Sequence, residues 1–233
     1  MAEVNIQKQV QRLLDAAIEK SARRDYALAL DELKAAEAID RENPVILYNL
    51  GICYIRTTLH RTAIDYLERI LQLPYTFVDV VIVRKLLAYC FLMTKDFQEA
   101  LRQLDESLRI SSRDTMAMSM KGYCLEQVGD VAGAMSIFRE VIGIDPHNYN
   151  SYNSLAYLMC RSGDDLTSAL KFAKIAMDSN PDNPAYLDTI GYIYMKKGQN
   201  DRAKKYFKRA YALMPDSEEI RLHVRQFLKI DEK

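Results

Sequence analysis

The chain has 233 residues, of which 49% are hydrophobic and 27% charged, with only 8 glycines and 6 prolines. This composition suits a continuous helical protein and argues against a disordered chain or a turn-rich β protein. Basic and acidic residues both number 32, so the chain as a whole lacks the cationic field that attracts nucleic acid or anionic lipid. Because it has no apolar run of signal-peptide or membrane-spanning length, we expect a cytoplasmic protein without membrane insertion.

An internal repeat of about 34 residues runs along the chain, and periods of this size indicate stacked supersecondary units. One position of the repeat is always small: Ala17, Gly51, Ala88, Gly122, Ala156 and Gly191. A second position is always alanine: Ala29, Ala63, Ala100, Ala134, Ala169 and Ala203. Two antiparallel helices approach closely where a side chain is missing, so both positions are predicted to lie in a helix–helix seam.

The predicted elements are therefore pairs of helices, taken here in chain order. The pairs span residues 10–43, 44–80, 81–114, 115–148, 149–183 and 184–217, which together form one array within residues 1–217. A polar capping helix is expected at 218–230, within a C-terminal segment at 218–233, because stacked repeats need a polar end. Prolines such as Pro146, Pro181 and Pro215 separate successive pairs, since proline cannot continue a helix interior.

The turn inside each pair has its own pattern. Gly129, Gly163 and Gly198 suit the left-handed backbone that ends one helix, and a following acidic residue is expected to cap the next. The second pair departs from this pattern, because Thr58 stands where the others have glycine or a charged residue. Three extra residues follow the second pair. Thr76 and Asp79 there resemble a capping box, which predicts that the next helix begins a turn early.

The segment from Phe77 to Val83 is strongly apolar. A longer buried helix and an exposed partner site that includes Phe77 and Val78 are both consistent with it.

These residues together resemble the tetratricopeptide repeat, over nearly the whole chain. The resemblance implies an all-α fold, a right-handed α-solenoid of stacked antiparallel helix pairs, and a protein that binds other proteins without catalysis. By the same resemblance, the residue after each small position faces a concave groove. In this chain those residues are Ile18, Ile52, Tyr89, Tyr123, Tyr157 and Tyr192. Tyr48 extends the same predicted groove.

A tyrosine buries a large area and keeps a hydroxyl that can bond to a peptide group, so four of them suit a bound peptide or helix. The same tyrosines could instead pack on the next helix, and both interpretations stay open. The family's clamp for a C-terminal carboxylate is matched only by Asn49, which disfavours binding of that type. Cofactors are not expected.

The residues offer no recognisable site for catalysis or for a metal. His60, His147 and His223 have no second ligand at metal-binding spacing and are predicted to be isolated surface histidines. Cys53, Cys90 and Cys124 recur at one repeat position and are predicted to be core thiols.

A basic run near the C-terminus includes Lys204, Lys205 and Lys208. It is interpreted first as a solvated outer face and second as a contact for an acidic partner or RNA. Nucleic acid is therefore not the expected partner. The predicted function is a scaffold or adaptor that holds a partner peptide or helix in a tyrosine-lined groove. The alternative is a structural subunit that uses its outer faces in a larger assembly.

Overall fold

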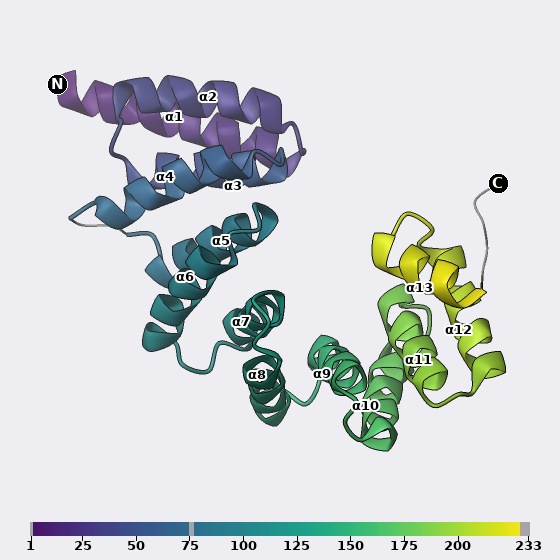
Figure 1. Ribbon diagram of the computed structural model, residues 1–233. Coiled ribbons are helices and arrows are strands. Elements are labelled where there is room, and N and C mark those ends of the chain that lie inside the picture. Colours follow the sequence, from purple (N-terminus) through teal and green to yellow (C-terminus); the bar gives the residue numbers. More distant parts are fainter. Residues whose placement is uncertain (1, 75–76, 229–233) are drawn as a thin grey trace. The chain divides into compact units, whose positions relative to one another are not determined.

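The structure is a computed structural model that describes residues 2–74 and 77–228. These residues form thirteen α-helices and no strand, which confirms the all-α prediction. Figure 1 labels the helices in chain order. The helices are α1 (Ala2–Ala22), α2 (Tyr26–Ile39), α3 (Pro44–Arg56), α4 (His60–Gln72), α5 (Val80–Met93), α6 (Phe97–Ile110), α7 (Thr115–Gln127), α8 (Val131–Ile144), α9 (Tyr149–Ser162), α10 (Leu166–Ser179), α11 (Pro184–Lys196), α12 (Asn200–Leu213) and α13 (Glu218–Leu228).

The chain divides into two compact units, an N-terminal unit at residues 1–128 and a C-terminal unit at residues 129–233. In the N-terminal unit α1 packs on α2, α3 on α4 and α5 on α6, and each pair packs on the helix that follows it. In the C-terminal unit α9 packs on α10 and α11 on α12, and α13 closes the end. The division between the two units falls inside the predicted fourth repeat, between α7 and α8.

The small residues allow the paired helices to approach closely. A Cβ atom added to Gly51 of α3 would lie 2.8 Å from Cδ2 of Leu67 in α4. A Cβ atom added to Gly191 of α11 would lie 2.8 Å from Cδ1 of Phe207 in α12. Contacts this short are essentially never made by a real Cβ, so alanine at either position would require the neighbouring side chain to shift, and the predicted seam is confirmed at these two pairs.

Each turn between paired helices contains one residue with left-handed backbone. Three of these residues are glycines, as predicted, and the other three are Arg24, Thr58 and Lys95 with φ between 62° and 65°. Left-handed backbone strains any residue with a Cβ, and a β-branched threonine most of all. The chain therefore keeps one turn geometry even where the sequence pattern of the turn is lost.

The predicted acidic caps are confirmed only in part. The side chains of Asp96, Asp130 and Asp165 accept a hydrogen bond from the first turn of α6, α8 and α10. Asp25 caps α2 without such a bond.

Helix α5 begins at Val80, with Asp79 as its N-cap. The Asp79 side chain accepts a hydrogen bond from the Val81 N–H at 2.8 Å. The prediction that this helix begins a turn early is wrong, because Asp79 itself occupies the capping position; its proposed cap, Thr76, lies outside the described residues. Val78 is half-buried and packs on the core, whereas Phe77 is fully exposed.

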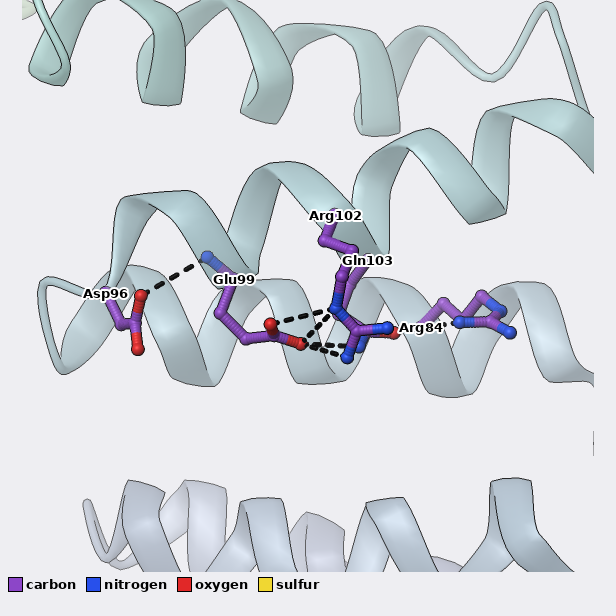
Figure 2. A network of polar contacts seen from close by, with 5 residues as sticks. All are labelled: Arg84, Asp96, Glu99, Arg102 and Gln103. Carbon is purple, nitrogen blue, oxygen red and sulfur yellow. Dashed lines mark hydrogen bonds and ion pairs between the residues drawn. The ribbon is translucent and has the colours of Figure 1, made fainter.

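A chain of polar contacts joins α5 to α6, where the equivalent positions of α3, α7 and α11 hold Leu47, Met118 and Leu187. Arg84 donates to Oε1 of Gln103 at 3.0 Å, and Gln103 donates to Glu99 at 2.9 Å. Figure 2 shows how these side chains lie. Glu99 also pairs with Arg102, whose hydrogen bond holds the pKa of the Glu99 carboxyl below its ordinary value. Because Gln103 is buried, this network fixes the pairing of α5 with α6 by polar as well as apolar contacts.

The two terminal helices differ from those between them. Helix α1 has 21 residues, whereas the other first helices of the pairs have 13 or 14. No described helix combines the length and the apolar composition that crossing a membrane requires. Helix α13 begins at Glu218, as predicted, and buries Ile220, His223 and Val224; residues 229 and 230 of the predicted cap lie outside the described residues.

Candidate partner-binding surface

The first helices of the N-terminal unit expose a row of large apolar side chains. Val45, Ile82 and Met116 each lie seven residues, or two helical turns, before Ile52, Tyr89 and Tyr123, and so share a helix face with them. We call the exposed members of this row the apolar stripe; they are Ile18, Val45, Ile82, Tyr89, Met93, Met116 and Tyr123. Their exposed fractions range from 39% to 64%, which is unusual for so many large apolar side chains in one row.

The structure separates the predicted groove residues of this unit into two groups. Tyr89 and Tyr123 are exposed, although Tyr89 also makes an edge-on contact with the His60 ring at 5.8 Å between ring centroids. Tyr48 and Ile52 are half-buried, and Tyr48 packs against the core. Ile18 is exposed as well, so Ile18, Tyr89 and Tyr123 are the predicted residues of this unit that remain accessible to a partner.

An open cleft of about 590 Å³ lies at the start of the stripe. It is bounded by α1, by the turn after α2 and by the first residues of α3. Its lining residues are Ile6, Gln7, Val10, Gln11, Leu14, Ile18, Ile39, Asp40, Asn43 and Val45. Asp40 is the one charged residue among them. The extended α1 thus continues the apolar surface beyond the first repeat.

Two lysines of the first helices, Lys20 and Lys85, pair with acidic residues of the same unit. Nζ of Lys20 lies 2.5 Å from Oε1 of Glu32, and Nζ of Lys85 lies 2.6 Å from Oδ2 of Asp114. Burial alone would raise the pKa of the Asp114 carboxyl, but the bond from Lys85 and backbone N–H bonds hold the pKa below its ordinary value. Asn49, the single match to a carboxylate clamp, donates its amide to the Val45 carbonyl at 2.8 Å.

In the C-terminal unit the two predicted tyrosines are half-buried. The rings of Tyr157 and Tyr192 lie 5.7 Å apart, and the Tyr192 ring stacks on His223 of α13 at 5.0 Å. Nζ of Lys196 lies 5.3 Å from the centre of the Tyr192 ring. These contacts give Tyr157 and Tyr192 a packing role at the end of the chain.

The prediction that His223 is an isolated surface histidine is wrong. His223 is buried, and its Nδ1 lies 2.7 Å from Oδ2 of the equally buried Asp188 in α11. Burial lowers the pKa of His223, but the hydrogen bond and the negative charge of Asp188 outweigh burial and raise the pKa above its ordinary value. The pair fastens α13 to α11. His147 is exposed, as predicted, and His60 is half-buried.

The cysteines lie in the core, as predicted for three of them. All four are buried, and burial raises the pKa of Cys90 to about 12 and of Cys124 and Cys160 to about 11. A thiol with such a pKa stays protonated near neutral pH and is a poor nucleophile. Within residues 2–74 and 77–228, no group of three metal-ligating side chains comes together.

The lysines of the predicted basic run, Lys204, Lys205 and Lys208, are all exposed on α12. Sequence reasoning missed two further exposed lysines, Lys171 and Lys174 of α10. The repeat pattern could have identified them. Lys171 lies two residues after the repeated alanine Ala169, as Lys205 does after Ala203. Lys174 and Lys208 each lie five residues after the same alanines.

Comparison with known proteins bears on the family and the fold. Models of the tetratricopeptide repeat match residues 46–74, 94–149 and 184–217. A TPR repeat-containing protein of Pseudomonas aeruginosa is 30% identical over 54% of this chain and 22% of its own length. The BBSome complex member BBS4 of Bos taurus is 24% identical over 82% of this chain and 36% of its own length. The chain thus spans about a third or less of these curated relatives.

A solved tetratricopeptide repeat protein from Parabacteroides merdae has the same fold. It superimposes with a TM-score of 0.77 over 97% of this chain and 94% of its own, at 15% identity. The three model matches indicate the same family as the repeated small residues and the helix pairs packed across them. The chain belongs to the tetratricopeptide repeat proteins.

Proposed function

We propose that the chain is a non-catalytic interaction scaffold that holds a peptide or helix of a partner protein against the apolar stripe. The exposure of the stripe on successive first helices is the observation that supports this most. Tyr89 and Tyr123 are its proposed centre. Tyr48 and Ile52 form its floor, whereas Tyr157 and Tyr192 support the fold of the C-terminal unit and contribute less to binding.

The chemistry of the stripe selects an apolar occupant. Each large apolar side chain that a partner covers contributes free energy roughly in proportion to the area removed from water, at about 25 cal/mol per Å². Lys20 and Lys85, which could attract an acidic segment, already have partners in Glu32 and Asp114. An amphipathic helix with apolar residues three and four positions apart would match side chains that are themselves spaced along parallel helices.

A second function is a structural subunit of a larger assembly. Large apolar side chains are also exposed outside the stripe, among them Phe77, Leu28 and Ile110. One relative reported above is itself a member of a multiprotein complex. Contacts through these outer side chains would then replace the stripe as the main interface.

Site-specific photo-crosslinking separates the two functions. A photoreactive phenylalanine is placed at Tyr89 or Tyr123, and at Tyr211 as a matched control, since Tyr211 is 40% exposed and Tyr89 39%. The proposal predicts that both stripe positions crosslink one partner segment in native lysate, while Tyr211 does not.

Capture by the unmodified chain should then fall for the double variant Tyr89→Ala, Tyr123→Ala and persist for Tyr211→Ala. Loss of at least about 2 kcal/mol of binding is expected for anchoring tyrosines. Capture that survives in the double variant and is lost in Leu28→Asp, Ile110→Asp would favour the assembly subunit.

A further inference from the structure

The outer face of the C-terminal unit carries five exposed lysines on two helices that both pack against α11. We define the lysine patch as Lys171 and Lys174 of α10 with Lys204, Lys205 and Lys208 of α12. Lys171 and Lys205 occupy one repeat position, and Lys174 and Lys208 another. Equivalent positions in stacked repeats lie on the same face of the stack, so these side chains project together.

The same two positions in the N-terminal unit are mixed in charge. There they hold Asp31, Asp65 and Arg102 at the first position and Lys34, Glu68 and Asp105 at the second. In α8, α10 and α12 they hold Ser136, Arg139 and the four lysines, without an acidic residue. The net charge of zero for the whole chain therefore conceals a separation of charge between the outer faces of the two units.

The lysines of the patch are not neutralised within the described part of the chain. None of the five forms an ion pair with an acidic side chain in residues 2–74 or 77–228, whereas Arg69, Arg102 and Lys121 of the N-terminal unit all do. Lys204 and Lys208 are one helical turn apart, and like charges at this spacing destabilise a helix. A self-repelling cluster that lowers stability is expected where an anionic partner offsets it.

The surroundings of the patch favour a short anionic ligand over a broad one. Asp178 lies at the end of α10 and Asp201 at the start of α12, so acidic residues limit the patch on both sides. Asp216 and Glu218 follow the end of α12. A bilayer or a nucleic-acid duplex would contact these acidic side chains together with the lysines and be repelled by them.

The residues suited to nucleic acid are engaged elsewhere. Arg209 donates to Asp182 at 2.9 Å and to the Pro181 carbonyl at 3.2 Å, so its guanidinium is not open for bidentate contact with a phosphate. Tyr206 stacks on Tyr194 at 5.6 Å between ring centroids and is half-buried, so it offers no free face to a base.

We propose that the lysine patch is a second docking surface, which binds a short acidic segment of a partner protein. Carboxylates spaced along an extended or helical segment would pair with lysines on both α10 and α12. The inference is independent of the apolar stripe, because the two surfaces belong to different units and select opposite chemistry.

Fluorescence anisotropy tests this with a labelled peptide that contains six glutamates, compared with the same peptide containing six glutamines. The patch variant is Lys171→Gln, Lys174→Gln, Lys205→Gln, Lys208→Gln. Its matched control removes the same charge from exposed residues of the N-terminal unit, as Lys8→Gln, Lys34→Gln, Arg61→Gln, Lys95→Gln. Thermal denaturation of both variants accompanies the binding measurement.

The proposal predicts that the patch variant binds the acidic peptide at least about tenfold more weakly, as expected when several charge pairs are lost. The control should retain its affinity, and the patch variant should unfold at a higher temperature than the original chain. Equal loss in both variants would show attraction by net charge alone and overturn the proposal. Patch-dependent binding to phosphatidylserine vesicles or to poly-uridine that exceeds binding to the peptide would also overturn it.

Discussion

Tyr89 and Tyr192 occupy the same position in two repeats, directly after Ala88 and Gly191, yet their surroundings differ. Tyr89 in the N-terminal unit is exposed and touches His60 edge-on. Tyr192 in the C-terminal unit is half-buried, and its ring stacks on His223 of the capping helix. The helix that packs beside a tyrosine thus decides whether its ring is exposed or half-buried. A residue type repeated at one position therefore identifies a candidate site without proving one.

The largest expected effect concerns the buried pair that makes this difference. His223→Ala leaves the Asp188 carboxylate buried without its partner and should cost about 3 kcal/mol of unfolding free energy in the C-terminal unit. His60→Ala, the matched change beside Tyr89, should cost about 1 kcal/mol, because His60 is half-buried and has no ion pair among the described residues. Chemical denaturation with hydrogen exchange over α11–α13 measures both. Equal costs would remove the distinction between the two tyrosines.

The closely packed helix pairs of the two units should differ in how much stability a glycine-to-alanine substitution costs. Gly191→Ala places a methyl group against the rigid Phe207 ring and should cost about 2 kcal/mol. Gly51→Ala meets the end of the flexible Leu67 side chain and should cost about 1 kcal/mol or less, since alanine also favours the helix. Thermal unfolding of the two variants checks the order, and a reversed order would mean that the backbone rather than the ring gives way.

Opposite substitutions at the left-handed turn positions of the two units should change stability in opposite directions. Thr58→Gly in the N-terminal unit removes a β-branched side chain from left-handed backbone and should stabilise the chain by about 1 kcal/mol. Gly163→Ala in the C-terminal unit introduces the same strain and should destabilise by a similar amount, about 1 kcal/mol. The urea midpoints of both variants test this. Shifts of the same sign would contradict the shared turn geometry.

The smallest expected effect is the pH dependence of stability, which should again differ between the two units. Since the pKa of His223 is raised in the folded chain, its contribution to stability is complete below the unfolded pKa of about 6.5 and is lost as pH rises through the higher folded pKa. Exchange protection in α13 should fall from pH 6 toward higher pH after correction for intrinsic rates. His223→Ala should abolish this dependence, whereas the variant His60→Ala should keep it.

Repetition made much of the fold predictable. Six copies of the small positions, and the prolines between pairs, determined the number and order of the helices, because only close-packed antiparallel helices explain them together. The turn at Thr58 followed the repeat despite its sequence, because the helices on either side fix the turn geometry more strongly than one residue opposes it.

Features that depend on contacts distant in sequence were not predictable. Asp188 lies 35 residues from His223, and nothing in their spacing indicates a pair until α13 is packed on α11. The network of Arg84, Gln103 and Glu99 could not be predicted from the sequence either, because charged residues on helices are usually solvated. The distinction between exposed and half-buried tyrosines has the same cause, because burial depends on neighbouring helices rather than on the repeat.

The four buried thiols can report local unfolding of the helix pairs that contain them. Cys53, Cys90, Cys124 and Cys160 each lie in a different first helix, α3, α5, α7 and α9, and each is fully covered in the folded state. In a stack where a repeat contacts only its neighbours, separate segments can open without global unfolding. The rate at which a small thiol reagent labels each cysteine would therefore record, repeat by repeat, how cooperativity is distributed along the chain.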